Sequence, residues 1–465
     1  MEKAKKIKTE LDMTHGKLFG KIVSFTLPVM LTGVLQLLFN AADMAVVGQL
    51  VSDQALAAVG STNSLVNLIL NLFMGLSVGT GVAMARCYGA KNKEYGDKIL
   101  HTSLPVAFVS GIVVMIIGVF TSRSLLELMN TPDNVIDLST QYLTIYFLGA
   151  PFNLVYNFGA SVMRSTGDSK RPLLYLTIAG IVNVIINIIS VVVFKMGVAG
   201  VAYATIMSQA ISAVMVVVAL ARNKGFAQFS FRRMRIHKRA LIDIVRVGLP
   251  SGIQGALFSI SNMLIQSTIN GFGDIVMAGN SVASSLEGFV YTCMNSVSNT
   301  AITVIGQNLG ARKTDRIKKA FWLCLGLTVC VGIFVGGMEL LLADPLISIY
   351  NKNPEVMKIA FIGMLIMNGT YFLNGAMEVV NFSMRGIGYS MTPMVIVLLG
   401  TCVFRIFWIY CIFPLDPVLQ NVYWSYPASW LLTFIVAFIT FLVLFKRLCR
   451  KIDATENQWQ QPQLQ

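Results

Sequence analysis

One carboxylate lies inside a long apolar stretch near the start of the chain. Residues 22–47 read IVSFTLPVMLTGVLQLLFNAADMAVV, and Asp43 is the acidic residue among them. An ionised side chain costs about 2.5–3.5 kcal/mol at the centre of a membrane, so this carboxylate must face a protein interior or a water-filled cavity. On a helix, Gln36, Asn40 and Asp43 share one face because they are spaced i, i+4 and i+7. We therefore expect a polar stripe inside a membrane protein. The alternative is that Asp43 lies near the outer end of its span and reaches interfacial water.

Two amides form a second polar pair. Asn183 and Asn187 are spaced i and i+4 in a stretch rich in Ile and Val. Amide oxygens and a carboxylate are hard ligands, suited to Na⁺ and poorly suited to soft metals. If no metal binds, burial disfavours the charged form of a carboxyl, which can then carry a proton. The amides could instead only bond neighbouring helices, at about 0.6 kcal/mol each.

The C-terminal half has a charged trio of its own, Glu287, Glu378 and Arg405. At 1.5 Å per residue, Glu287 lies about 15 Å from the outer end of its span and Arg405 about 20 Å from the inner end. Glu378 lies closer to the cytoplasm. Because unpaired charges are costly there, we hypothesise that Arg405 pairs with one or both acids and lines a substrate cavity. A purely structural ion pair is the alternative.

The composition indicates which kind of fold positions these residues. The 465 residues are 55% hydrophobic and 12% charged, whereas a soluble protein is about 25% charged. With mean hydropathy +0.69, the chain is predicted to be an all-α integral membrane protein. A spanning helix needs about 20 apolar residues. We predict twelve spans, at about 22–47, 54–84, 99–120, 137–160, 173–194, 198–221, 241–270, 277–305, 320–342, 357–383, 392–413 and 421–445.

The basic residues predict the orientation. Threading twelve spans through a membrane places nearly all of the 36 Lys and Arg on one side, which is the cytoplasmic side by the positive-inside rule. The exceptions are Arg123, Lys195, Lys352, Lys358 and, within a span, Arg405. Both termini are then cytoplasmic. The net charge of +14 is explained by this rule and by attraction to anionic membrane lipids, without a nucleic-acid partner.

An internal repeat organises the chain. Pro28 recurs as Pro250, and four further marks recur at nearly the same shift along the sequence. These are Gly89-Ala90 with Gly310-Ala311, Arg164 with Arg385, Gly167 with Gly388, and Pro172 with Pro393. Six helices per copy make the repeats parallel, so we expect two pseudo-symmetric six-helix bundles around a central cleft. The predicted parts are a cytoplasmic segment 1–21, bundles 22–221 and 241–447, a basic linker 222–240 and a tail 448–465.

An enzyme is not expected. GLSVG at 75–79 matches the GxSxG pattern of a nucleophilic serine, but it lies in an apolar helix rather than at a strand-to-helix turn. We interpret it as a small-residue contact between helices. The seven cysteines show no metal-binding spacing and are interpreted as small core residues.

At these residues the chain resembles the multidrug and toxic compound extrusion (MATE) family. The resemblance lies in LPVMLTGVLQLLFNAADMAVVGQL followed by ALAAVG, in ARCYGAKN, in the turns MRSTGDSKRP and MRGIGYSMTP, and in GVAGVAYATIMSQ. It covers essentially the whole chain. It implies a multi-pass transporter in the bacterial inner membrane that acts as a monomer and needs no cofactor besides its coupling ion.

The resemblance also implies a coupling site. Asp43 falls on the acidic position of the family's first helix, although the Thr that often follows is Met44 here. In one branch, that acid binds a cation or proton with polar groups that match Asn157, Asn183, Asn187 and Thr205. Asp43, Asn183 and Asn187 would be the Na⁺ ligands. That branch often has a second carboxylate at the position of Asn187.

Another branch uses a Glu on the seventh helix and an Asp on the tenth. Those positions hold Phe258 or Ser259, and Asn374, in this chain, so a sodium site of that type is not expected.

The implied function is antiport: export of amphipathic, cationic drugs or toxic metabolites in exchange for Na⁺ or H⁺. Gln36, Asn40, Glu287, Glu378 and Arg405 would line the substrate cavity. The alternative is a flippase for lipid-linked oligosaccharides or lipids from a related superfamily. Such proteins tend to have a cationic cavity, whereas this one would be mainly acidic.

Overall fold

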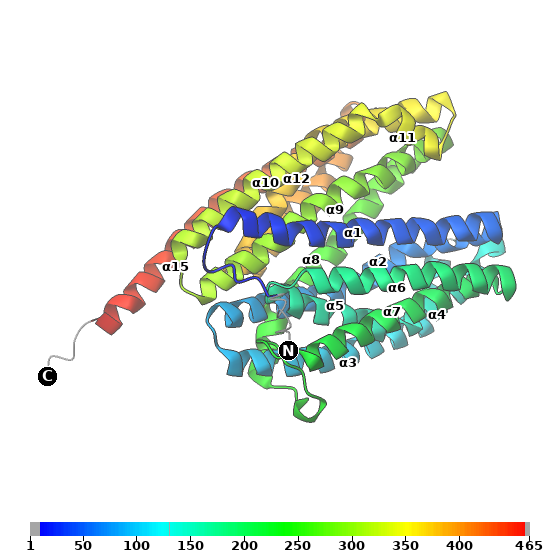
Figure 1. Ribbon diagram of the computed structural model, residues 1–465. Coiled ribbons are helices and arrows are strands. Elements are labelled where there is room, and N and C mark those ends of the chain that lie inside the picture. Colours follow the sequence, from blue (N-terminus) through cyan, green and yellow to red (C-terminus); the bar gives the residue numbers. More distant parts are fainter. Residues whose placement is uncertain (1–9, 130, 461–465) are drawn as a thin grey trace. The chain divides into compact units, whose positions relative to one another are not determined.

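The chain is helical throughout the part that the structure describes. A computed structural model describes residues 10–129 and 131–460, and no strand occurs within these ranges. The first helices are α1 (Leu18–Leu50), α2 (Asp53–Gly89), α3 (Lys93–Leu128), α4 (Asp133–Leu148), α5 (Ala150–Ser165), α6 (Lys170–Ile188), the π-helical η1 (Ile189–Val193) and α7 (Gly197–Arg222) (Figure 1). The prediction of an all-α membrane protein is confirmed.

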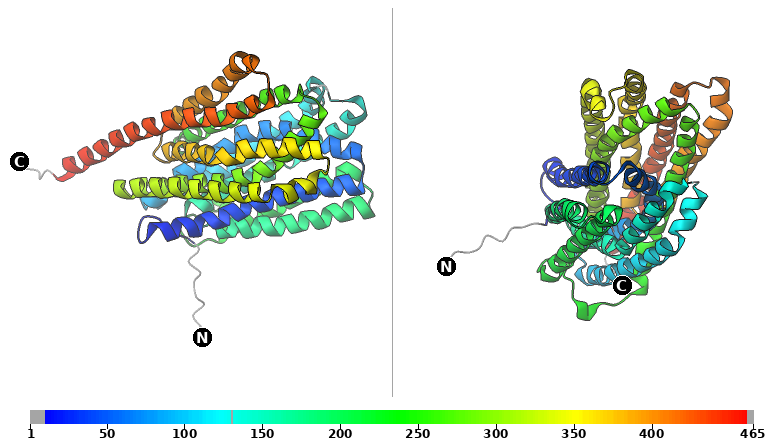
Figure 2. Two further views of the ribbon diagram at one scale, coloured as in Figure 1. Left: turned by 90° about the horizontal axis from the view of Figure 1, so that it is seen from above. Right: turned by 90° about the vertical axis from the view of Figure 1, so that its right-hand side faces the viewer.

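The second part of the chain continues in the same way. Its helices are the 3₁₀ turn η2 (Phe231–Arg233), α8 (Lys238–Asn270), α9 (Asp274–Gly310), α10 (Thr314–Leu341), α11 (Ala343–Tyr350), α12 (Pro354–Gly386), α13 (Met391–Val397), η3 (Leu398–Val403), α14 (Phe404–Phe407), η4 (Trp408–Ile412), η5 (Phe413–Leu415) and α15 (Leu419–Gln460). The last turns of α15 extend beyond its neighbours α10 and α12 (Figures 1 and 2).

Contacts divide the chain into two compact units. The first contains mainly Val23–Tyr88 and Asn92–Ile260, and the second mainly residues 261–460, with 13–22 and 89–91. The predicted bundles 22–221 and 241–447 are divided according to the repeat, so the second bundle begins near the start of α8. The contacts instead divide the chain after Ile260, inside α8. Parts of the predicted cytoplasmic ends, at 1–9 and 461–465, lie outside the described residues.

The beginning of α8 packs in the first unit through glycines. A Cβ on Gly75 of α2 would lie 2.1 Å from the backbone nitrogen of Gly252, and one on Gly79 would lie 2.1 Å from the carbonyl oxygen of Ile244. No side chain fits there, so the two backbones touch. GLSVG is thus a helix-packing site, as predicted.

The repeat is visible in the turns. Lys91 and Arg312, which occupy equivalent positions in the two copies, both adopt a left-handed conformation with φ of 55° and 56°. Gly167 and Gly388 also share positive φ values, 92° and 105°. Left-handed backbone is unfavourable for most residues, so its recurrence at equivalent positions indicates equivalent turns.

Ten helices are long and apolar enough to cross a membrane, counted over the described residues. The predicted span 137–160 is not among them because the chain breaks at Gly149 into α4 and α5, each of 16 residues. Helix α9, over the predicted span 277–305, has 37 residues but is not among the ten. The count of twelve spans stays a prediction.

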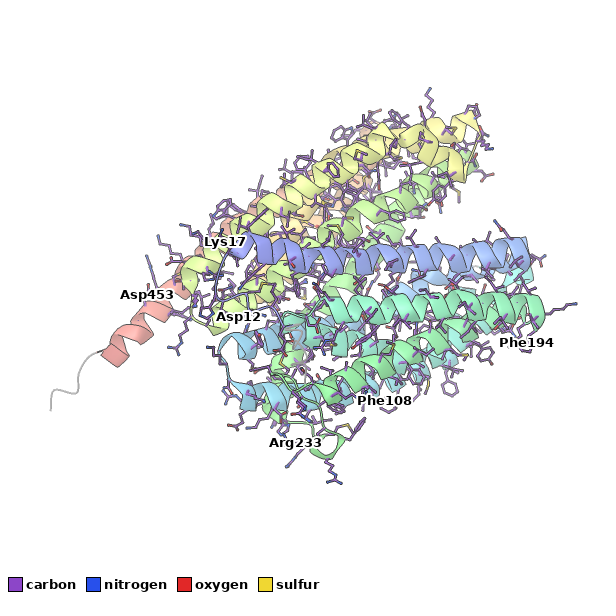
Figure 3. All side chains as sticks on the ribbon, viewed as in Figure 1. Asp12, Lys17, Phe108, Phe194, Arg233 and Asp453 are labelled. Atoms are coloured by element: carbon purple, nitrogen blue, oxygen red, sulfur yellow. The ribbon has the colours of Figure 1, made fainter. Side chains whose placement is uncertain are left out.

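The outer surface of the first unit agrees with a lipid environment. Phe194 is 67% exposed and Phe108 is 50% exposed, and both project outward (Figure 3). Arg233 of the basic linker lies at the other end of this unit from Phe194 (Figure 3). The exposed phenylalanines agree with an apolar outer surface, and the cytoplasmic location of the linker stays a prediction.

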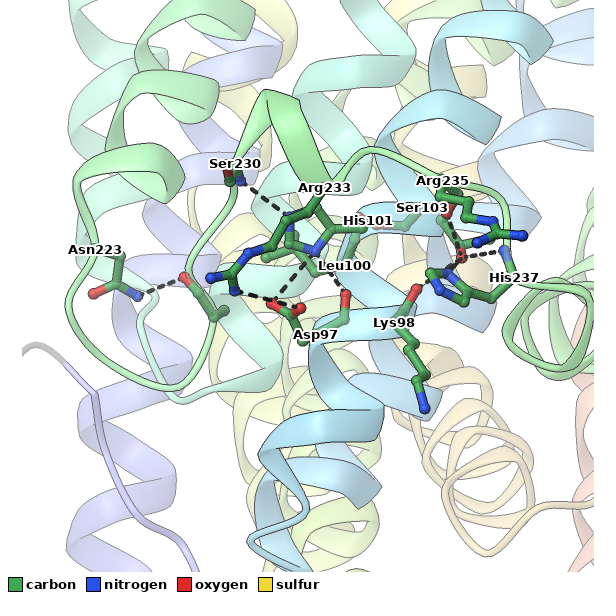
Figure 4. A network of polar contacts seen from close by, with 12 residues as sticks. Asp97, Lys98, Leu100, His101, Ser103, Asn223, Ser230, Arg233, Arg235 and His237 are labelled. Atoms are coloured by element: carbon green, nitrogen blue, oxygen red, sulfur yellow. Dashed lines mark hydrogen bonds and ion pairs between the residues drawn. The ribbon is translucent and has the colours of Figure 1, made fainter.

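The basic linker is anchored on α3 (Figure 4). Nε2 of His101 accepts a hydrogen bond of 3.0 Å from the backbone N–H of Ser230, and its Nδ1 lies 2.8 Å from the carbonyl oxygen of Asp97. The imidazole is 1% exposed and stacks on Phe229, with ring centres 5.4 Å apart. Because a carbonyl only accepts, the proton is on Nδ1.

Candidate functional site

The predicted carboxylate and the two predicted amides meet in the first unit. Nδ2 of Asn187 in α6 donates a hydrogen bond of 2.5 Å to Oδ1 of Asp43 in α1. It also lies 3.2 Å from Oδ1 of Asn183. Asn187 is fully buried, and its own Oδ1 accepts no hydrogen bond. The site therefore presents a carboxylate and a buried amide oxygen that lacks a donor.

Close packing of α1 on α6 orients these groups. A Cβ on Gly180 would lie 1.9 Å from the ring of Phe39, so the ring fits only because position 180 is glycine. Phe39 and Asp43 are one turn apart on α1, while Gly180, Asn183 and Asn187 follow one face of α6. The carboxylate is thus held toward the amides. Its contact with a fully buried residue argues against the alternative in which Asp43 only reaches interfacial water.

Two tyrosines of α4 also lie within electrostatic range of Asp43, and the sequence analysis did not identify them. Tyr142 and Tyr146 interact electrostatically with the carboxylate, and Tyr146 is hydrogen-bonded to Gln209 of α7. Tyr142 packs in a hydrophobic cluster with Val47 and residues of α7. The available signal was the i, i+4 spacing of the two tyrosines, which places both on one helix face.

The other two residues predicted for the ion site bond within their own helices. Nδ2 of Asn157 donates to the carbonyl oxygen and Oδ1 of Asn153 at 2.8 and 3.0 Å. The Thr205 hydroxyl donates to the carbonyl of Val201 at 3.0 Å. The structure therefore brings together Asp43, Asn183 and Asn187. A role for Asn157 and Thr205 in coupling stays a prediction.

Gln36 and Asn40 are exposed, whereas Asp43 on the same helix is partly buried. The hydrogen bond to α6 distinguishes Asp43 from the other members of the predicted stripe. Whether Gln36 and Asn40 contact a substrate stays a prediction.

Arg405 is a buried charged residue of the second unit with several partners. It is fully buried, Nε donates to the Ser429 hydroxyl at 2.9 Å, and Nη1 donates to Oδ1 of Asn262 at 3.1 Å. The guanidinium carbon lies 4.2 Å from the centre of the Tyr426 ring, a cation–π contact. Glu287 interacts with it electrostatically. Glu287 is thus one of several partners.

Glu378 has another basic neighbour. It interacts electrostatically with Arg385, two turns further along α12, and both interact with Tyr291. Of the two acids that were expected near Arg405, Glu287 is the one whose charge reaches it. The use of these three residues as a substrate cavity stays a prediction.

An all-helical fold with several helices able to cross a membrane and a partly buried, hydrogen-bonded carboxylate is typical of multi-pass membrane transporters. The MatE family model matches twice, at residues 28–189 and 250–411. The two matches cover more than half of the chain, and the second begins and ends at one constant offset from the first, which supports the predicted duplication. The protein belongs to the MatE family.

Known relatives agree with this assignment. The probable multidrug resistance protein YoeA of Bacillus subtilis is 28% identical over 379 residues, which are 80% of this chain and 82% of YoeA. The probable multidrug resistance protein YpnP of the same organism is 30% identical over 66% of this chain and 68% of YpnP. These relatives do not favour the flippase alternative, and the family is one of transporters rather than enzymes.

A solved structure shares the fold. A multidrug resistance MATE family transporter of the MOP superfamily, in an outward-facing conformation, superposes with a TM-score of 0.88 at 22% identity. The superposition covers 94% of this chain and 98% of that chain.

Proposed function

We propose that this protein is a secondary antiporter that exports amphipathic, cationic drugs or toxic metabolites in exchange for Na⁺ or H⁺. The observation that supports this best is the hydrogen bond from fully buried Asn187 to Asp43, inside a helix able to span a membrane. A carboxylate in such a place is costly unless it is paired or hydrated, and residues of this kind mark functional sites. The proposed exchange uses no cofactor besides the coupling ion.

Ion binding at Asp43 could change the hydrogen bond that joins α1 to α6. When Asp43 is ionised, Nδ2 of Asn187 satisfies it. When a proton or Na⁺ neutralises the carboxylate, that donor is no longer needed, and the carboxamide can turn its unsatisfied Oδ1 toward the bound ion. Ion occupancy then changes the contact between α1 and α6. Coupling requires such a contact, one that differs between two states.

The proposed activity requires a membrane location and a topology. We place the protein in a bacterial inner membrane as a monomer, with twelve spans, both termini cytoplasmic and the basic linker facing anionic lipid. Its partners would be small-molecule substrates and membrane lipids, without nucleic acid.

Transport in proteoliposomes with separately imposed Na⁺ and H⁺ gradients tests this function. A fluorescent amphipathic cation should leave the interior when one of the two gradients is applied. Asp43→Asn should abolish gradient-driven efflux, because the amide holds neither a proton nor a net charge. Asp133→Asn is the matched control, since Asp133 is an exposed acid in the first turn of α4.

Two results would contradict the proposal. Efflux by well-folded Asp43→Asn at the wild-type rate would remove the coupling role of this carboxylate. Efflux that responds to neither gradient would exclude secondary antiport for this class of substrate.

A further inference from the structure

A buried carboxylate that the sequence analysis did not identify lies in the second unit. Glu339, near the end of α10, is 9% exposed, and its Oε2 accepts a hydrogen bond of 2.8 Å from Nδ2 of Asn368 in α12. A Cβ on Gly336 would lie 2.7 Å from the carbonyl oxygen of Asn368, so the two helices touch about one turn before Glu339. This contact holds the carboxylate against the amide.

A second acid lies within electrostatic range. Glu287 of α9 interacts with Glu339, is hydrogen-bonded to Tyr371 of α12, and interacts with Arg405. Two ionised acids and one guanidinium leave one negative charge uncompensated. Excess charge inside a membrane-spanning bundle is unfavourable. Charge balance is reached if this group holds one more positive charge.

The other groups around the two acids do not supply that charge. Glu339 also interacts electrostatically with Cys293 of α9, and Glu287 with Tyr423 and Tyr426 of α15. Thiols and phenols are neutral or negative, never positive. Among the described residues, the other basic groups of α12 are Lys358, which is exposed near the start of the helix, and Arg385, whose charge interacts with Glu378.

A buried amide oxygen without a hydrogen-bond donor gives independent evidence that a further group binds beside Glu339. Asn368 is 3% exposed, and its Oδ1 is buried without a hydrogen-bond donor, although Nδ2 of the same carboxamide binds Glu339. Buried amide oxygens are normally satisfied by a protein group, a water or an ion. A species that donates hydrogen bonds would satisfy it.

We propose that Glu339 and Glu287 share one exchangeable proton and form an ion site in the second unit, separate from Asp43. A proton fits better than Na⁺ because Oε2 of Glu339 faces an N–H donor, whereas a metal ion would need an oxygen ligand there. Its use in driving efflux rests on the proposed function. The presence of the proton can be measured without transport.

Infrared difference spectra of purified protein, recorded between acidic and alkaline pH, test the proposal. A protonated carboxylic acid has its own carbonyl band. We expect Glu339→Gln and Glu287→Gln each to lose the same component, because either change leaves one acid and one guanidinium in the group, whose charges sum to zero. The double variant should lose one proton and not two. Glu127→Gln, an exposed acid paired with Arg123, should keep the component.

The outcomes separate this site from the first one. Asp43→Asn should leave the component in place, whatever its effect on transport. Persistence of the component in both single variants would overturn the proposal. Loss of two protons in the double variant would show two independent acids and would also overturn it.

A second experiment uses wild-type protein, so its result does not depend on whether the variants fold. Dicyclohexylcarbodiimide modifies protonated carboxyls in apolar surroundings, and peptide mass mapping locates the product. We expect one modification per molecule, at Glu339 or Glu287, that declines as the pH rises. Absence of this modification, or its suppression by Na⁺ at constant pH, would overturn the proposal.

Discussion

Nδ2 of Asn187 and Oδ1 of Asp43 lie 2.5 Å apart and join α6 to α1 within the first unit. Hydrogen bonds to a charged group contribute about 1.5–3 kcal/mol, more than bonds between neutral groups. Since Asn187 is fully buried, no water competes for its amide. One bond therefore stabilises the packing of two helices and responds to the charge of the candidate ion site.

Asn187→Ala should reduce both stability and transport. Loss of the donor leaves Asp43 without its amide partner, so we expect the free energy of unfolding to fall by about 1–3 kcal/mol. Gradient-driven efflux should fall by about fivefold or more if the bond carries the coupling. Unfolding in detergent and efflux from proteoliposomes measure the two effects. Thr177→Ala, whose hydroxyl bonds to the carbonyl of Leu173 within α6, should cost less in both assays. Equal losses would contradict the assignment.

Gly79→Ala should destabilise the first unit. The added methyl group would lie 2.1 Å from the carbonyl oxygen of Ile244, and backbone cannot move aside as a side chain can. Overpacking of this kind costs about 1–3 kcal/mol. The measurement is the thermal unfolding midpoint in detergent. Gly337→Ala is the control, because a Cβ there meets nothing within 4 Å. Matching midpoints for the two variants would show that α2 and α8 do not pack as described.

Arg405→Lys should not behave as a conservative change. Lysine keeps the charge but cannot reproduce the bonds to Ser429 and Asn262 together with the flat contact on Tyr426. We expect a loss of about 1–3 kcal/mol in the free energy of unfolding. Arg123→Lys, at an exposed pair of acids, should change it by less than about 1 kcal/mol. A fully stable Arg405→Lys would mean that charge alone matters at this position.

His101→Ala should loosen the basic linker. The change removes the acceptor for the Ser230 N–H (Figure 4). It also removes the ring that stacks on Phe229. If each contact contributes about 1 kcal/mol, the open state rises by about tenfold or more. Limited trypsin digestion after Arg232 or Arg233 should accelerate accordingly. Glu94→Gln, which alters an exposed pair with Lys98, serves as the control. Unchanged cleavage in His101→Ala would show that other contacts hold the linker.

The amino-acid sequence by itself determined the class of the protein and the members of its first candidate site. Hydropathy, the excess of basic residues in short loops and the internal repeat are properties of the chain order, so they are readable before folding. Asp43 and the Asn183–Asn187 pair were identifiable for the same reason. A polar residue in an apolar span is conspicuous, and spacing assigns it to a helix face.

Only the tertiary structure decided which of these residues meet. Asn187 reaches Asp43 while Asn157 and Thr205 bond within their own helices, because the ring of Phe39 packs on Gly180 and turns one face of α6 toward α1. Glu339 likewise meets Asn368 because Gly336 lets two helices touch. Such contacts join residues far apart in the sequence, and they depend on side-chain fit between helices, which periodicity within one helix does not encode.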